Sequence, residues 1–107
     1  MARRNDVVVA RVFYSDSSDS KLRPCVVLSN ERYNSAGYVA VAPITTSGDE
    51  FCLPIGESDA DCRFMPGSGV RFDTIMRIHA SQIAKRIGRV KDGFYYELIS
   101  RIRGLIE

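Results

Sequence analysis

The chain has 107 residues, of which 45% are hydrophobic and 26% charged, so its size and composition are those of a single globular domain spanning residues 1–107. No apolar run approaches the ~18 residues of a membrane span, and Asp6 and Arg11 interrupt the basic N-terminal stretch, unlike in a signal peptide. The sequence therefore predicts a cytoplasmic protein without a membrane partner.

The charges are unevenly distributed along the chain. Fifteen Lys and Arg residues against thirteen Asp and Glu residues give a net charge of +2. Residues 1–61 hold six basic and nine acidic side chains, whereas residues 62–107 hold nine basic and four acidic ones. Twelve of the fifteen cations are arginines, whose planar guanidinium suits phosphate and carboxylate. This pattern fits a phosphate-bearing partner, and it equally fits a solvated basic face.

The first half of the chain has the pattern of a β-sheet. Runs of β-branched residues predict strands at residues 6–13, 24–29 and 38–42. The polar segment Tyr14–Lys21 between the first two strands is expected to be a mobile loop, because it has almost no apolar side chain to bury. Turn-forming residues at Asn34–Gly37 predict a hairpin, which would make the second and third strands antiparallel neighbours.

The second half continues the sheet. An edge strand at residues 51–55 lies within a long acidic, Gly- and Pro-rich loop at residues 47–68. Two further strands are expected at residues 70–78 and 83–90, joined by a turn at residues 79–82. So many short strands at close spacing predict a small, strongly curved sheet or barrel.

The last segment changes to the periodicity of a helix. Asp92 is its expected N-cap, and Glu97 and Arg101 have the spacing of an i,i+4 ion pair. The fold class is therefore mainly β with a C-terminal helix. The residues that define one apolar helix face are Phe94, Leu98, Ile102 and Leu105.

The cysteines and the single histidine argue against metal or triad chemistry. Cys25, Cys52 and Cys62 match neither a C-x-x-C pair nor a zinc framework, and His79 is the one histidine in the chain. We therefore expect no metal and no cofactor. Cys25 lies within an apolar run and is interpreted as a core residue rather than a reactive thiol.

Two polar groups stand where neighbouring strands are expected to adjoin. Pro24 fixes the direction of the chain where Arg23 enters the second strand, and Thr45, Thr46 and Ser47 follow the third strand. If these strands are antiparallel neighbours, Arg23 and Thr45 meet at one edge of the sheet. The alternative is that Arg23 is a surface cation and that the hydroxyl run is an ordinary strand terminus.

Charged residues also share one expected strand face. Arg71 and Asp73 have the spacing of same-face neighbours, and Arg77 lies on the same face four residues later. Such a pair is commonly a surface ion pair. Arg86, Arg89 and Lys91 are expected to form a solvated rim with a secondary role in attracting phosphates.

Taken in order along nearly the whole chain, these segments resemble the MazF/PemK family of toxins from type II toxin–antitoxin systems. The resemblance implies an SH3-like barrel, a homodimer, a cognate protein antitoxin and a metal-independent endoribonuclease acting on single-stranded RNA. The segments are Asn5-Asp6-Val-Val, Arg23-Pro24-Cys-Val-Val-Leu-Ser29-Asn30, Tyr33-Asn34, Ala42-Pro43-Ile44-Thr45-Thr46, Arg71-Phe-Asp73, Lys85-Arg86-Ile-Gly-Arg89 and the C-terminal helix.

The resemblance implies that Arg23 and Thr45 are the catalytic residues. It further implies that Arg71 and Asp73 serve RNA binding or proton transfer. Lys21, Thr46 and Arg77 are expected to contact RNA, and the loop Ser15–Lys21 to read unstacked bases.

Two departures from the family pattern stand out. Asn5 replaces the usual glycine of a Gly-Asp opening, and the acidic stretch Ser47–Asp61 has no clear counterpart. Two alternative functions stay open from the residues: a CcdB-like toxin that binds DNA gyrase without catalysis, and an RNA-binding barrel without cleavage.

Overall fold

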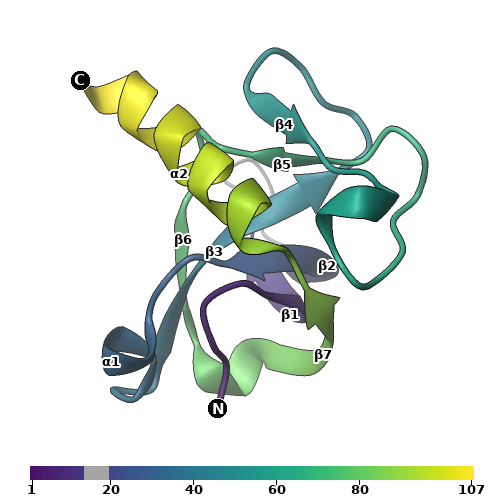
Figure 1. Cartoon of the computed structure of the whole chain (residues 1–107). Coiled ribbons are helices and arrows are strands. Elements are labelled where there is room, and N and C mark those ends of the chain that lie inside the picture. Colours follow the sequence, from purple (N-terminus) through teal and green to yellow (C-terminus); the bar gives the residue numbers. More distant parts are fainter. Residues whose placement is uncertain (14–19) are drawn as a thin grey trace.

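The computed structural model describes residues 1–13 and 20–107 as a curved antiparallel sheet with one long helix packed across it (Figure 1). The expected mainly β fold with a C-terminal helix is confirmed. The strands are β1 (Asp6–Phe13), β2 (Ser20–Val27), β3 (Tyr38–Thr45), β4 (Cys52–Pro54), β5 (Gly69–Arg71), β6 (Met76–His79) and β7 (Ile83–Arg89). The helices are α1 (Glu31–Asn34) and α2 (Asp92–Ile106), and short 3₁₀ turns lie at Glu57–Asp59 and Ala80–Gln82.

The sheet is organised around β3. Its strand order is β4-β5-β3-β2-β1-β7, and β6 also pairs with β3. The first half of β3 pairs with β6, and its last two residues, Ile44 and Thr45, pair with β5. The expected antiparallel pairing of the second and third strands is confirmed, with α1 and Gly37 in the connection between them.

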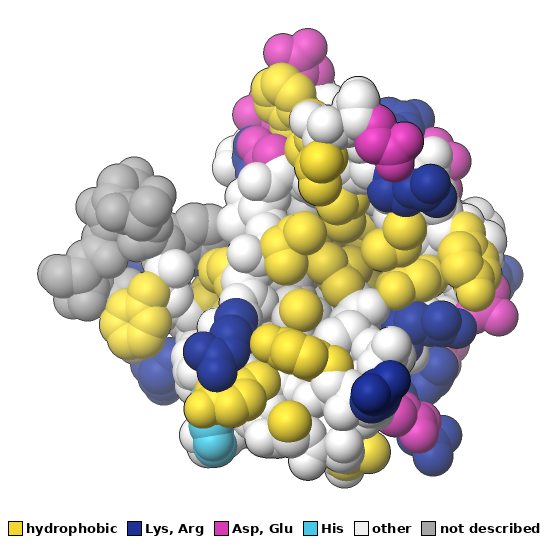
Figure 2. All heavy atoms as spheres, turned by 90° about the vertical axis from the view of Figure 1, so that its left-hand side faces the viewer, with side chains coloured by type: hydrophobic (Ala, Val, Ile, Leu, Met, Phe, Trp, Pro, Cys, Tyr) yellow, Lys and Arg dark blue, Asp and Glu magenta, His cyan; other side chains and the backbone are white. Residues whose placement is uncertain are grey.

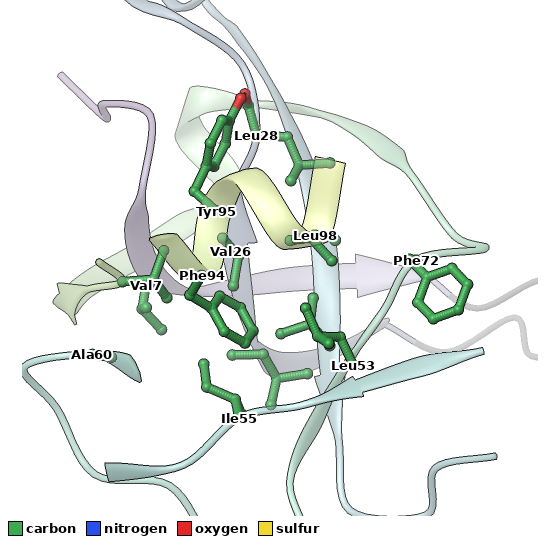
Figure 3. Packing of buried hydrophobic residues seen from close by; sticks show 14 of the residues in the cluster. Val7, Val26, Leu28, Leu53, Ile55, Ala60, Phe72, Phe94, Tyr95 and Leu98 are labelled. Atoms are coloured by element: carbon green, nitrogen blue, oxygen red, sulfur yellow. The ribbon is translucent and has the colours of Figure 1, made fainter. Parts of the chain in front are cut away.

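Both faces of the central strands are buried. On one face, Val26 and Ala42 pack with Phe94 and Leu98 of α2 in one apolar cluster (Figure 3). On the other face, a second cluster contains Cys25, Val27 and Val41 among others. This arrangement explains why residues 7–10, 25–28 and 39–44 are continuous apolar runs rather than alternating ones.

The single strand expected at residues 70–78 is wrong, because two strands occupy this range. β5 ends at Arg71 and β6 begins at Met76, with the bend between them. Both strands pair with β3, but at opposite ends of it, so the chain must cross from one end to the other. Phe72, at the start of the crossing, turns into the apolar cluster beneath α2.

The start of α2 also differs from expectation. Lys91 occupies the N-cap position and makes no side-chain capping bond, so the prediction that Asp92 is the N-cap is wrong. The Asp92 carboxylate instead accepts a hydrogen bond of 2.7 Å from the side-chain amide of Asn5. The expected pair between Glu97 and Arg101 is confirmed, with a contact of 2.9 Å.

Asn5 holds the N-terminal turn in the conformation that a glycine would adopt. Its φ angle is +79°, in the left-handed region that asparagine tolerates better than most residues. Its side-chain amide also donates to the backbone oxygen of Val90, which ties the N-terminus to the start of α2. Asn5 therefore adopts a backbone conformation that a glycine at this position would also allow.

Asp6 is a buried carboxylate that forms ion pairs with two arginines of β7. Its side chain is 3% exposed, and it accepts hydrogen bonds from Arg86 at 3.0 Å and from Arg89 at 3.1 Å. The backbone N–H of Arg3 donates to its other oxygen. Arg86 and Arg89 stay at the surface, with 51% and 38% of their side chains exposed, so the expected solvated rim is confirmed for these two residues. Asp6 in addition holds both guanidinium groups in place.

No helix within the described residues has the length and apolar character needed to span a membrane. The expected mobile loop falls mainly on residues 14–19, which lie outside the described residues, and β2 begins at Ser20.

Replacing Asp6 should destabilise the fold. Asp6→Ala leaves two guanidinium groups without their buried partner, and we expect the free energy of unfolding to fall by about 2–3 kcal/mol, less than for a fully buried pair because both arginines reach solvent. Urea denaturation monitored by circular dichroism measures this change. Glu97→Ala breaks an exposed pair and should cost under about 1 kcal/mol. Equal losses in the two variants would contradict this account of Asp6.

Candidate functional site

The register between β2 and β3 brings Arg23 and Thr45 together. Cys25 pairs with Pro43 in the last step of the ladder toward this end. Continuing the same antiparallel register by two residues places Arg23 across from Thr45. Pro43 has no backbone N–H, so the hydrogen-bond ladder between β2 and β3 lacks one donor near the end that carries Arg23 and Thr45.

A pocket of about 360 Å³ opens at this edge. Arg23 and Thr45 both line it, and both side chains are half-buried. The expectation that these two residues meet at one edge is confirmed, while their chemical roles stay a prediction. Among the described residues that line the pocket, two are arginines and none is acidic. The lining consists of Arg23, Pro24, Ile44, Thr45, Thr46, Ser47, Arg63, Phe64, Met65 and Ser68.

The Thr45 hydroxyl is held at the rim by the turn that follows β3. Its oxygen accepts a hydrogen bond of 3.2 Å from the backbone N–H of Ser47 and lies 3.1 Å from the Ser47 hydroxyl. A threonine hydroxyl can accept and donate at once, so its own hydrogen can still be given to an oxygen in the pocket. The site thus offers a positioned neutral donor beside a guanidinium.

Cys25 lies beneath the pocket in the core rather than in it. Its side chain is fully buried, and this burial raises the pKa of the thiol to about 12, although the Arg23 charge acts in the opposite direction. The thiol therefore stays protonated and unreactive at neutral pH. The interpretation of Cys25 as a core residue is confirmed.

The opposite wall of the pocket comes from a segment that the sequence pattern marked only as an acidic loop. Arg63, Phe64, Met65 and Ser68 line the pocket, and none of them was expected there. One signal was available: Phe64 and Met65 are large apolar residues inside an otherwise polar, Gly- and Pro-rich stretch. Their position depends on how the loop docks onto the sheet, which local sequence does not reveal.

Arg71 and Asp73 contact each other as expected, although they do not lie on one continuous strand. The Arg71 guanidinium donates to both oxygens of Asp73, at 2.9 and 2.8 Å, and reaches Asp49 at 3.2 Å. The hydrogen bond from Arg71 holds the pKa of Asp73 below its usual range. The pKa of Asp49 is also lowered, first by the backbone N–H of Phe51 and further by Arg71.

This Arg71–Asp73–Asp49 group lies beside the pocket rather than in its lining. A second hollow of about 320 Å³ adjoins the first, because Thr46 and Ser68 line both. Asp49 lines this second hollow, whereas Arg71 and Asp73 are not among its lining residues. Both hollows thus lie next to each other at the end of β3.

The remaining expected RNA contacts are scattered. Thr46 lines both hollows. Lys21 is exposed on β2, two residues before Arg23, and is outside the lining of the pocket. Arg77 pairs with Ala40 in the first half of β3, and its guanidinium stacks on the Tyr38 ring at 3.7 Å from the ring centroid. Arg77 is therefore at the far end of β3 from Thr45, and it does not share a strand face with Asp73.

Comparisons with known proteins identify the family of the chain. Residues 3–106 match the family model described as PemK-like, MazF-like toxin of type II toxin-antitoxin system. The chain is 33% identical over 91 residues to the endoribonuclease toxin ChpB of Escherichia coli K12, a match covering 79% of this chain and 75% of that protein.

Solved structures share the fold. A Mycobacterium tuberculosis toxin, MazF-mt6, superposes with a TM-score of 0.73 at 24% identity, covering 92% of this chain and 93% of that one. A MazE–MazF structure from Deinococcus radiodurans gives a TM-score of 0.73 at 16% identity and covers 98% and 95% of the two chains. With the family model spanning nearly the whole sequence, this chain belongs to the PemK-like, MazF-like toxins of type II toxin–antitoxin systems.

Proposed function

We propose that this toxin is a metal-independent, sequence-selective endoribonuclease that cleaves single-stranded RNA with Arg23 and Thr45 at the scissile phosphate. The observation that carries the proposal is the shared pocket, which presents a guanidinium and a hydroxyl and no carboxylate among its described lining residues. Phosphate is the ligand that such a donor set favours. The family assignment and the endoribonuclease relative support RNA as the substrate.

The reaction needs little from the protein beyond positioning and charge stabilisation. The RNA 2′-hydroxyl loses its proton and attacks the adjacent phosphorus, and the bond from phosphorus to the 5′-oxygen breaks. The leaving 5′-oxygen takes up a proton, so the products are a 2′,3′-cyclic phosphate and a 5′-hydroxyl. Alignment of the attacking and leaving oxygens and stabilisation of the phosphorane supply the rate enhancement.

We assign Arg23 the stabilisation of the negative charge that develops on the phosphorane. A guanidinium stays charged at neutral pH and donates through several N–H groups, so it stabilises the non-bridging oxygens and the developing 5′-oxyanion but is a poor proton donor. Thr45 is assigned a hydrogen bond to a non-bridging oxygen, because its hydroxyl is already oriented by Ser47.

The 2′-hydroxyl must give its proton to an acceptor. Asp73 stays our candidate, but its carboxylate is engaged by Arg71, which lowers its pKa and weakens it as a base. The Arg71–Asp73 pair also serves to hold the loop that follows β3, since Arg71 reaches Asp49.

A homodimer and a cognate antitoxin are the proposed partners. Hydrophobic side chains bordered by Lys and Arg gather on the face formed by β6 and the end of α2 (Figure 2). Exposed apolar residues on or next to these elements are Ile75, Leu105 and Ile106. Such a face suits a second copy of the chain.

An acidic, partly disordered antitoxin segment would then cover the cationic pocket. A structural neighbour of this chain is an endoribonuclease solved in complex with its cognate antitoxin, with a TM-score of 0.79 and 17% identity. We place the protein in the cytoplasm, where its RNA substrate is.

Purified protein should cleave single-stranded RNA in the presence of EDTA and leave 2′,3′-cyclic phosphate and 5′-hydroxyl ends. A 2′-deoxynucleotide at the scissile position should abolish cleavage there, since the nucleophile is gone. Arg23→Ala should lower kcat by about 10²–10³-fold, the loss typical of one oxyanion donor.

End-group analysis by mass spectrometry identifies the product ends and shows whether the 2′-deoxy site is cut. Initial rates at saturating RNA give kcat for Arg23→Ala and the wild type. Cleavage that survives the 2′-deoxy substitution would contradict the mechanism. Binding without cleavage would leave an RNA-binding barrel, and gyrase binding alone would leave a CcdB-like toxin.

The Asp73 carboxyl should titrate below its ordinary pKa of 3.8 in the wild-type protein, because Arg71 stabilises its charged form. Arg71→Met removes that hydrogen bond, so the midpoint should rise toward the ordinary value. The stabilising contribution of the pair is present above the ordinary pKa and is lost as the pH falls through the lowered one. Carbon-13 NMR of the carboxyl carbon measures both midpoints, and an unchanged midpoint would count against the pair.

A further inference from the structure

Arg63 is the second cation that lines the pocket holding Arg23 and Thr45. It belongs to the segment between β4 and β5, on the wall facing the strand ends. This segment directly follows the acidic stretch at residues 47–61. Neither the motif residues nor the expected RNA contacts include Arg63.

The backbone around Arg63 is anchored on both sides. Cys62 and Phe64 are half-buried and pack against the apolar cluster beneath α2, whereas Arg63 and Met65 between and after them are exposed. Asp61 is paired through its backbone with Arg89 of β7. The alternation of inward and outward side chains therefore aims Arg63 away from the core.

Two further features rigidify this wall. Residues Met65–Ser68 form a tight turn in which the Ser68 N–H donates to the Met65 oxygen at 3.1 Å, with Gly67 at a φ of +83°. Pro before a glycine of positive φ is the pattern of a type II turn. A β-carbon on Gly88 would lie 2.6 Å from the Cys62 side chain, so that glycine permits the segment to dock closely.

The charge of Arg63 is available to a ligand. Within residues 1–13 and 20–107, no ion pair or hydrogen bond involves its guanidinium. Arg71, by contrast, is occupied by two carboxylates, and Arg89 is held by Asp6. Arg63 is thus a cation on a fixed backbone, at the mouth of a pocket and without an internal counter-charge.

We propose that Arg63 binds a phosphate of the RNA backbone adjacent to the scissile one, an inference that rests on the proposed nuclease function. A pocket of about 360 Å³ is at the lower end of the ~300–1,000 Å³ range of ligand sites, so a bound RNA chain must continue beyond it. Arg23 and Thr45 occupy the strand-end wall, and the exposed Arg63 meets the chain on the other side. This contact is the same before and during the reaction, so it lowers KM and leaves kcat unchanged.

The test measures RNA binding separately from cleavage. The probe is a short fluorescein-labelled RNA that carries a mapped cleavage site with a 2′-deoxynucleotide at the scissile position, followed by fluorescence anisotropy. Arg63→Ala should raise Kd and KM by about tenfold at low salt, with kcat within about threefold of wild type. The slope of log Kd against log salt should decrease by about 0.7, the value for one phosphate contact to a single strand.

Two variants control for charge and folding. Arg63→Lys keeps the positive charge and should restore most of the salt slope. Arg32→Ala removes an equally positive, exposed residue on α1, at the opposite end of β2 and β3 from the pocket, and it should leave Kd and the slope unchanged. Thermal melts should show that Arg63→Ala folds as the wild type does, since the side chain is exposed.

The outcomes separate the two proposals. If Arg63→Ala keeps the wild-type Kd and salt slope while Arg23→Ala still loses turnover, Arg63 has no phosphate contact and the nuclease proposal stands. If Arg63→Ala loses kcat rather than affinity, the assignment to a neighbouring phosphate is wrong. If the wild-type protein neither binds nor cleaves RNA, both proposals fail together.

Discussion

The antiparallel register between β2 and β3 is the constraint on which the site depends. A slip of one residue would carry Arg23 away from Thr45 and turn the side chains of one strand to the opposite face of the sheet. Burial on both faces prevents such a slip. Val26 and Ala42, which pair with each other, pack beneath α2, while the next pair, Val27 and Val41, packs on the other face. The apolar core therefore positions the two polar residues at the strand ends.

The arginine content of the chain overstates its free positive charge. Many of the arginines in the described part of the chain are committed to internal partners. Asp6 holds two of them and joins the N-terminus to β7. Arg71 joins the bend after β5 to the loop before β4 through two carboxylates. These three guanidinium groups are thus partly neutralised within the fold, whereas the described lining of the pocket holds two arginines and no carboxylate.

The parts of the fold that sequence predicts well are those set by local pattern. Strands β1 and β7 lie where the sequence pattern places them, and α2 follows from the spacing of Phe94, Leu98 and Ile102. For β2 the apolar run begins only at Pro24, although the strand itself already begins at Ser20, within the expected loop. The meeting of Arg23 and Thr45 was predictable because it needs only two neighbouring antiparallel strands and a turn. The individual roles of these residues rest on chemistry and family likeness.

The predictions that the structure corrects concern features that depend on contacts between residues distant in sequence. The break between β5 and β6 arises because β3 accepts two partners at different positions along its length, and no local breaker residue marks it. Asp92 does not cap α2, because the side chain of Asn5 reaches it from the other end of the chain. Arg63 lines the pocket because Cys62 and Phe64 dock their loop onto the core.

The central claim is that Arg23 and Thr45 act on the same phosphodiester. A double-mutant cycle with Arg23→Ala, Thr45→Val and the double variant, read as kcat on a matched RNA, tests it directly. Groups that share one phosphate should be coupled, so the loss in the double variant should fall about tenfold or more short of the product of the single losses. Single losses that multiply to within about twofold would show two independent residues and contradict the account.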